Sequence, residues 1–172
     1  MALAPQEQGP YLGHLMAPGI WFCHAAATHK QSRVVGVTAT RASALLLPMA
    51  EFDKMVTRYP ASCRFFIATT MINMSVAMGA SDDLLIRDAS CRCIATPLRL
   101  ARLRCSSGLT PTLAEVDVTQ EELAYLSNLS RNATGPLLRD LQKRGLIEFA
   151  YKSIRILNTA ALQDMVRSGG ET

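Results

Sequence analysis

The sequence has few of the features that mark common classes of enzyme. Aromatic residues make up 6% of its 172 residues, and the chain contains three histidines. No cluster combines a nucleophile, a base and a group that orients the base. His14, His24 and His29 lie in a region without a catalytic pattern. We therefore expect that the protein is not an enzyme and that it has no cofactor and no metal site.

Cysteine is present in a number and arrangement that do not favour disulfides. The five residues form an odd, scattered set: Cys23, Cys63, Cys91, Cys93 and Cys105. Such a set does not indicate a disulfide framework. The pair Cys91 and Cys93 is too closely spaced for a common zinc knuckle. Buried free thiols are the expected state, and a thiol redox sensor that uses this pair is an alternative.

Long apolar runs and targeting signals are also missing from the sequence. No uninterrupted apolar run approaches the roughly 18 residues that a membrane span requires. The start "MALAPQEQGP" has no basic segment followed by an apolar one, so it does not resemble a secretory signal. These features predict a cytoplasmic protein with no membrane partner.

The charge is modest but unevenly distributed. The formal net charge is +4, which alone does not indicate a nucleic-acid partner. Arginine is in local excess in one stretch, where Asp88 is the single acidic residue. The arginines of this stretch are Arg87, Arg92, Arg99, Arg102 and Arg104. This stretch is predicted to be a basic helix, and a solvated helix face without a partner is an equally good interpretation.

The first half of the chain is predicted to begin with strands and to continue with helices. From Trp21 to Leu47, short runs such as "SRVVGVTAT" and "SALLLP" have strand character. The segment "MAEFDKMVTRY" has helical spacing and ends at Pro60. A longer helix is predicted from about Ala61 to Gly79 or a little beyond, and Gly79, Ala80 and Ser81 are expected to loosen its end.

The long helix carries one apolar stripe, which is formed by Ile67, Met71, Met74 and Met78. Their four-three-four spacing is typical of a helix that packs along another helix. The partner is either the protein's own core or the same helix of a second subunit. After this helix, Asp82 or Asp88 is expected to cap a new one, with a kink at Pro97.

The segment after the connector "SSGLTPTLAEVD" has the pattern of two short helices joined by a tight turn. Thr119 is an N-cap followed by acidic residues, and Asn128 lies where the backbone needs positive φ. Ser130 caps a second helix, and "LIEFAYKSIRIL" adds two strands around Tyr151 and Lys152. This pattern predicts a winged helix-turn-helix. A protein-interaction module with the same geometry is the alternative.

The stretch "TQEELAYLSNLSRN…LLRDLQKRGLIE…KSIRIL" resembles the DNA-binding end of the bacterial cyclic-AMP receptor protein and fumarate-nitrate regulator (CRP/FNR) family. The segment "MAPGIWFCHAAATHKQSRVVGVTATRASALLLPMAEFDKMVTRYP" is similar to the later strands and following helix of that family's cyclic-nucleotide-binding β-roll. The resemblance covers about residues 13–166. It implies an N-terminally truncated family member in which the long helix mediates dimerisation.

The resemblance also implies where nucleotide binding has been lost. In place of the family's phosphate-binding pattern the chain has Cys23-His24 and then Arg33-Val34-Val35, so only the arginine survives. The position that resembles the adenine-contacting threonine is Ala77. No specific response to cAMP is therefore expected.

The predicted fold class is α+β, with three parts. These are a partial cyclic-nucleotide-binding-like β-roll with its following helix (1–60), a dimerisation helix (61–87) and a winged helix-turn-helix DNA-binding domain (88–172). The predicted partners are double-stranded DNA, a second copy of the chain and, further, RNA polymerase. The predicted function is sequence-specific transcription regulation. A regulator that dimerises with a relative without reading DNA is the alternative. The predicted DNA-binding residues are Thr119, Gln120, Ser130, Arg131, Asn132, Lys152 and Ser153, and the dimerisation residues are Ile67, Met71, Met74 and Met78.

The recognition helix departs from the family at its centre. Where the family presents Arg, Glu and Arg to bases, this chain has Arg131, Asn132 and Pro136. A proline beyond the first helical turn removes one backbone hydrogen bond, so a kink at Pro136 is expected.

Overall fold

The computed structural model describes residues 2–4, 11–14, 21, 36–37, 43, 45–104 and 115–169. The chain divides into two compact units, Met1–Met74 and Ser75–Thr172. The division falls inside the long helix α2, which spans Cys63–Leu85. The predicted three-part division stays a prediction.

The first unit contains a small antiparallel sheet in the order β2-β1-β3. Its strands are β1 (Ala2–Ala4), β2 (Tyr11–His14) and β3 (Gly36–Val37). β3 lies within the predicted strand "SRVVGVTAT", whereas β1 and β2 precede the region in which strands were predicted. Much of that region, including Arg33 and its neighbours, lies outside the described residues.

The predicted strand "SALLLP" is wrong over Leu45–Pro48, which forms neither helix nor strand. Leu45 and Leu46 are almost fully exposed, at 101% and 91%. An apolar run becomes a strand only when a neighbouring strand pairs with it and a packed face buries it. Pro48 instead acts as the N-cap of the next helix.

The first unit continues with α1 (Met49–Arg58), the short 3-10 helix η2 (Pro60–Ser62) and the start of α2. The helix predicted to end at Pro60 is confirmed. Aromatic side chains gather around Phe66, whose ring centroid lies 4.8 Å from that of Phe52 and 5.4 Å from that of Trp21. No residue of this unit whose burial is described is buried.

α2 continues beyond Gly79 to Leu85. Gly79 and Asp83, which lie in its last turns, are buried. By length and composition alone, Pro60–Leu85 is apolar enough to cross a membrane, and 6% of its most apolar window is buried. The predicted stripe is exposed along this helix, at 62% for Ile67 and 54–56% for the three methionines.

The second unit is organised around α3 (Ala89–Leu100), which begins at Asp88 and contains Pro97. The Asp88 carboxylate accepts a hydrogen bond from the backbone N–H of Cys91 at 2.7 Å, which confirms Asp88 as a helix cap. α3 is the most deeply buried helix of the unit. Its fully or nearly fully buried residues are Cys93, Ile94, Ala95, Thr96 and Leu98.

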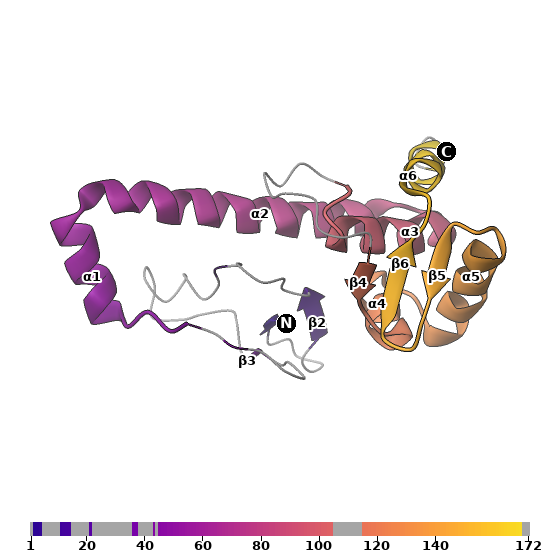
Figure 1. Ribbon diagram of the computed structural model, residues 1–172, viewed down its shortest axis with the longest axis horizontal. Helices are drawn as coiled ribbons and strands as arrows, with labels where there is room; N and C mark the ends of the chain where they lie inside the picture. The colour runs from indigo at the N-terminus through magenta and orange to yellow at the C-terminus, as the bar shows by residue number, and fades with distance from the viewer. Residues whose placement is uncertain are drawn as a thin grey trace. The chain divides into compact units, whose positions relative to one another are not determined.

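The rest of the second unit is a winged helix-turn-helix. It comprises β4 (Glu115–Asp117), α4 (Gln120–Leu126), α5 (Arg131–Lys143), β5 (Ile147–Phe149), β6 (Ser153–Ile156) and α6 (Thr159–Ser168). The strands form an antiparallel sheet in which β6 lies between β4 and β5 (Figure 1). The α+β fold class is confirmed, and α5 is continuous through Pro136.

Candidate nucleic-acid interface

The helix-turn-helix begins with a capping box at the start of α4. The Thr119 hydroxyl oxygen accepts from the backbone N–H of Glu122 at 3.2 Å. In return, the Glu122 carboxylate accepts from the backbone N–H of Thr119 at 2.9 Å. Reciprocal bonds of this kind satisfy two of the otherwise unpaired donors at a helix start. Thr119 is therefore engaged in holding α4, and it is half-buried.

The turn between α4 and α5 has the backbone geometry that the sequence predicted. Asn128 has φ of 50°, a left-handed conformation that asparagine tolerates better than most residues. The backbone N–H of Leu129 donates to the carbonyl oxygen of Ala124 at 2.9 Å and closes the turn. The turn fixes where α5 starts relative to α4.

The first turn of α5 combines a secured start with an exposed polar face. The Ser130 hydroxyl accepts from the backbone N–H of Ala133 at 3.2 Å, so Ser130 is the N-cap as predicted. Thr134 and Leu138 face the core and are 0% and 3% exposed. Arg131 and Asn132 are exposed side by side on the other face. These two residues can reach a partner, and the helix beneath them is held by packing.

Pro136 lies in the same helix without interrupting it. Its ring is exposed, and its nitrogen has no hydrogen to donate to the carbonyl oxygen of Asn132. Because Asn132 is itself exposed, water can solvate that carbonyl oxygen. Leu138 and Leu141, which follow this missing bond in the helix, are buried and anchor that part of α5.

The wing is the connection between β5 and β6. The backbone N–H of Ala150 donates to the carbonyl oxygen of Ser153 at 2.9 Å and closes the tip. Tyr151 is 87% exposed, and Nζ of Lys152 lies 5.4 Å from the centre of its ring. Lys152 is exposed and Ser153 half-buried. Within the second unit the exposed wing tip thus offers one positive charge and one aromatic ring.

Much of the predicted basic character of the α3 region is used inside the protein. Nε of Arg92 donates to the carbonyl oxygen of Ser127 at 2.8 Å, and Nη1 donates to that of Ile86 at 2.6 Å. Arg92 therefore ties the start of the helix-turn-helix turn to the chain just before α3. Sequence patterns did not identify this role, because none of its acceptors is a side chain.

A buried carboxylate accounts for two more arginines. Asp83 is 0% exposed and pairs with Arg99 at 2.7 Å. Arg104 pairs with the other oxygen of the same carboxylate. Ion pairs of this depth link the last turn of α2 to the end of α3 within the second unit. They show that a local excess of arginine in the sequence was not simply a solvated face.

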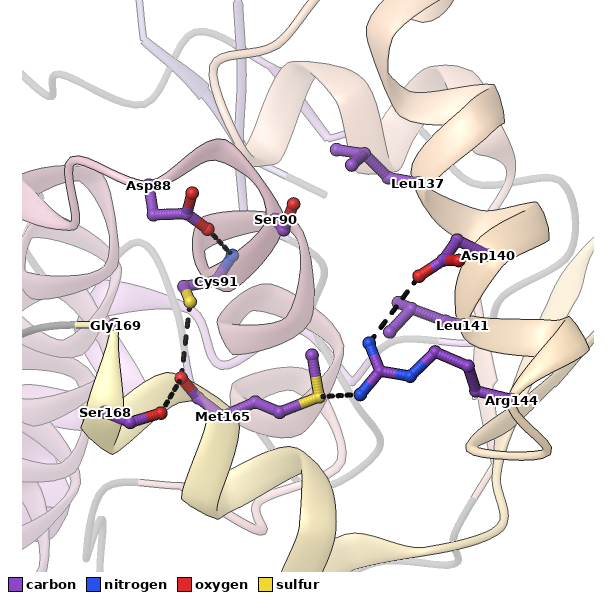
Figure 2. A pocket seen from close by; sticks show the side chains of 10 residues that line it. All are labelled: Asp88, Ser90, Cys91, Leu137, Asp140, Leu141, Arg144, Met165, Ser168 and Gly169. Carbon is purple, nitrogen blue, oxygen red and sulfur yellow. Dashed lines mark hydrogen bonds and ion pairs between the residues drawn. The ribbon is translucent and has the colours of Figure 1, made fainter.

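A pocket of about 350 Å³ lies among α3, α5 and α6 (Figure 2). Its polar groups already bond to one another: Nη1 of Arg144 lies 3.5 Å from the Asp140 carboxylate, and Nη2 lies 3.3 Å from the Met165 sulfur. The Cys91 thiol donates to the Met165 carbonyl oxygen at 3.3 Å. Arg144, Asp140, Met165 and Cys91 are therefore engaged with one another at the pocket wall.

The two cysteines of α3 are in environments that favour the neutral thiol. Burial raises the pKa of Cys93 to about 12. Burial, together with the hydrogen bond and charge of Asp88, raises the pKa of Cys91 to about 11. Thiolate is the reactive form, so this pair is poorly suited to redox sensing. Within the described part of the chain, no group of three or more His, Cys, Asp or Glu residues could hold a metal ion.

This part of the chain is similar to a known family of DNA-binding domains. The Crp-like helix-turn-helix domain matches residues 92–165, which run from Arg92 through the turn and wing into α6. The second unit therefore contains a Crp-like helix-turn-helix domain, and the predicted resemblance to the CRP/FNR family is confirmed. No curated protein matches the sequence.

Several solved structures share the fold at low sequence identity. A CRP-family transcriptional regulator from Thermus thermophilus, TTHB099, is 21% identical with a TM-score of 0.60, over 96% of this chain and 83% of that one. A CRP/FNR-family regulator from the same organism, TTHA1359, is 19% identical with a TM-score of 0.61, over 98% and 83%. The c-di-GMP responsive regulator CLP from Xanthomonas campestris is 16% identical with a TM-score of 0.59, over 91% and 79%. The chain spans about half, 52% and 55%, of two further solved structures that it matches.

Proposed function

We propose that the protein is a sequence-specific DNA-binding transcription regulator of the CRP/FNR type that acts as a homodimer and does not respond to cAMP. The observation that carries this proposal is the first turn of α5. It is capped by Ser130 and anchored by buried Thr134, and it presents Arg131 and Asn132 outward. A helix of this kind is suited to enter a major groove.

The exposed residues have distinct chemical uses. The guanidinium of Arg131 can donate two hydrogen bonds to the edge of a guanine, and the amide of Asn132 can pair with adenine. Lys152 on the wing can neutralise a phosphate, and Ser153 beside it can donate to one. Thr119 and Ser130 contribute by capping the two helices, and exposed backbone N–H groups at a helix start also favour phosphate.

The stripe on α2 supports a dimer. Four apolar side chains at Ile67, Met71, Met74 and Met78 are more than half exposed in the isolated chain. Their spacing matches a seam with an identical helix, which would bury them together. A bilayer would instead contact the whole circumference, including Asn73 and Asp82. We therefore assign the stripe to a second copy of the chain.

The absence of a cAMP response follows from the residue types noted in the sequence. Ala77 is exposed on α2 and cannot donate or accept a side-chain hydrogen bond. The stretch around Arg33 lies outside the described residues, so its part in the proposal rests on sequence alone. Isothermal titration calorimetry should detect no saturable micromolar binding of cAMP.

The deciding experiment is selection of binding sites from random duplex DNA, followed by affinity measurements over a range of salt concentrations. A regulator of this type enriches a two-fold symmetric sequence, which it binds more tightly than random DNA. Affinity for both should fall as salt rises, because phosphate contacts release counterions. Failure to enrich any sequence, with the dimer intact, would support the alternative of a protein-interaction regulator. RNA polymerase remains a predicted partner.

A further inference from the structure

The side chain of Gln120 makes a specific contact with the recognition helix. Gln120 is the first residue of α4, and Arg131 is the first residue of α5. Nε2 of Gln120 donates to the carbonyl oxygen of Arg131 at 3.1 Å. A side chain that was expected to face DNA phosphate is thus bonded to the backbone that carries the base-reading arginine.

Gly135 provides the space in which this contact is made. A Cβ atom at Gly135 would lie 2.9 Å from Nε2 of Gln120, closer than real Cβ contacts come. The nearest other atom, Nη1 of Arg139, would be 3.5 Å away, which is ordinary contact. Glycine inside a helix costs about 1 kcal/mol relative to alanine. Because Nε2 is the far end of a flexible side chain, a Cβ at position 135 would displace the Gln120 amide and leave the helix in place.

The neighbouring proline makes an external bond at this turn more important. Because Pro136 lacks an N–H, the carbonyl oxygen of Asn132 has no donor four residues later. The first turn of α5 is therefore held by fewer bonds of its own. The Gln120 amide adds a bond to the adjacent carbonyl oxygen, that of Arg131.

We infer that Gln120 and Gly135 form a seat that sets the orientation of the first turn of α5 and so determines which base edges Arg131 and Asn132 reach. Gln120 is a positioning residue in this arrangement, not a phosphate ligand. The inference rests on the proposed DNA-binding function. Gln120 and Gly135 thus influence specificity without touching a base.

The test uses the full-length protein with Gln120→Ala, Gly135→Ala and the two combined. The readout is the ratio of affinity for the selected operator to affinity for random DNA at one salt concentration. Each single change should lower this ratio roughly 2- to 10-fold, the range expected for one lost hydrogen bond, with random-DNA affinity unchanged. The combined variant should be no worse than Gln120→Ala alone, because the Cβ then has room.

Thermal unfolding separates positioning from stability. Gly135→Ala should keep or raise the melting temperature, since alanine favours the helix, while it lowers the specificity ratio. Glu121→Ala, at the exposed next position of α4, is the matched control and should leave the ratio unchanged. If Gly135→Ala does not fold, Gln120→Ala carries the test.

Two results would overturn the inference. Equal weakening of operator and random DNA by Gln120→Ala would mean that this residue holds a phosphate. Additive effects of the two substitutions would mean that they do not share one contact.

If the unaltered protein selects no operator, the proposed function is wrong, and the arrangement of Gln120 and Gly135 needs a separate test. Hydrogen exchange at the amides of α5 in the unaltered protein and the three variants provides it. Additive changes in protection would overturn the inference, and non-additive changes would support it.

Discussion

The two units of this chain differ in how completely they bury their own apolar residues. In the second unit, α3 alone contributes eight buried residues, of which Thr96 and Arg99 are polar or charged, and each of the following helices contributes at least two. In the first unit, α1 contributes none, and the three stripe residues of α2 that lie in this unit, Ile67, Met71 and Met74, are exposed. The second unit has a closed apolar core of its own. Among the described residues, the apolar stripe of α2 is left exposed.

This difference indicates which role each unit would have in a transcription regulator. A unit with a closed core can hold side chains such as Arg131 in a fixed geometry. An exposed helical stripe can join two such units, and symmetric operators require that kind of pairing. The following substitutions test this contrast, from the largest expected effect to the smallest.

The most disruptive change is to place charge in the stripe. Met71→Glu combined with Met74→Glu should convert the dimer to monomer at micromolar concentration. The expected loss is on the order of 5 kcal/mol or more, because each uncompensated buried charge is costly. Sedimentation equilibrium measures this directly. Leu84→Glu, at an exposed position of α2 outside the four-residue stripe, is the control. A dimer that survives the double change would show that α2 is not the seam.

The buried ion pairs predict the next largest effect, within the second unit. Asp83→Ala leaves Arg99, whose side chain is 4% exposed, without its carboxylate. Removing one partner of a buried pair typically costs about 3–5 kcal/mol, so the free energy of unfolding should fall by that amount. Urea denaturation measures it. Asp164→Ala removes an ion pair whose side chains are 71–72% exposed and should cost less than about 1 kcal/mol. Equal effects would mean that the second unit does not extend into α2.

The cysteines of α3 provide a test of burial that needs no substitution. With the Cys91 pKa at about 11 instead of 9.0, its thiolate fraction at pH 8 should be about 100-fold lower than in the unfolded chain. Alkylation followed by peptide mapping should therefore be about 100-fold slower in the native protein. Because folding raises the pKa of the Cys91 thiol, its protonated form favours the folded state. The stability that this thiol contributes is complete below pH 9 and is lost as the pH rises toward 11. Rapid native labelling of Cys91 and Cys93 would restore the redox-sensor alternative.

The sequence predicted a region well where its structure depends on contacts between residues that are close in the sequence. The cap at Thr119, the turn at Asn128 and the cap at Ser130 each depend on contacts within a few residues, and all three are in the structure. The end of α2 was predicted only loosely, at Gly79 or a little beyond, because Gly79 suggested a break. Asp83 holds the last turns through arginines 16 and 21 residues away, and no local pattern contains that information.

The same distinction applies to the candidate site. Arg131, Asn132 and Lys152 were predicted by their places in the motif, and the structure shows all three exposed. Whether they contact DNA stays a prediction. The bond from Gln120 to Arg131 and the internal use of Arg92 could not be predicted, because both depend on how α4 packs against its neighbours. Side-chain to backbone contacts across elements leave no spacing pattern in a sequence.

Base recognition should depend on Arg131 more than on other surface arginines. Arg131→Ala is expected to weaken binding to the selected operator by about 1–3 kcal/mol and to relax selectivity at one position. Repeating the DNA selection with the variant identifies that position. Arg167→Ala, on α6 and 72% exposed, should change neither affinity nor selectivity. If both variants behave alike, the exposed face of α5 is not in the groove.

The smallest effect is expected at the wing, and it should differ in kind from that of Arg131. Lys152 is expected to contact a phosphate, which carries no sequence information. Lys152→Ala should therefore weaken binding to operator and random DNA equally. It should also make the slope of log affinity against log salt shallower by about one, because one fewer counterion is released. Lys54, which is exposed on α1 and pairs with Glu51 at 2.8 Å, is the matched control in the first unit. A change in slope for Lys54→Ala, with none for Lys152→Ala, would move the phosphate contacts to the first unit and reverse the division of roles between the two units.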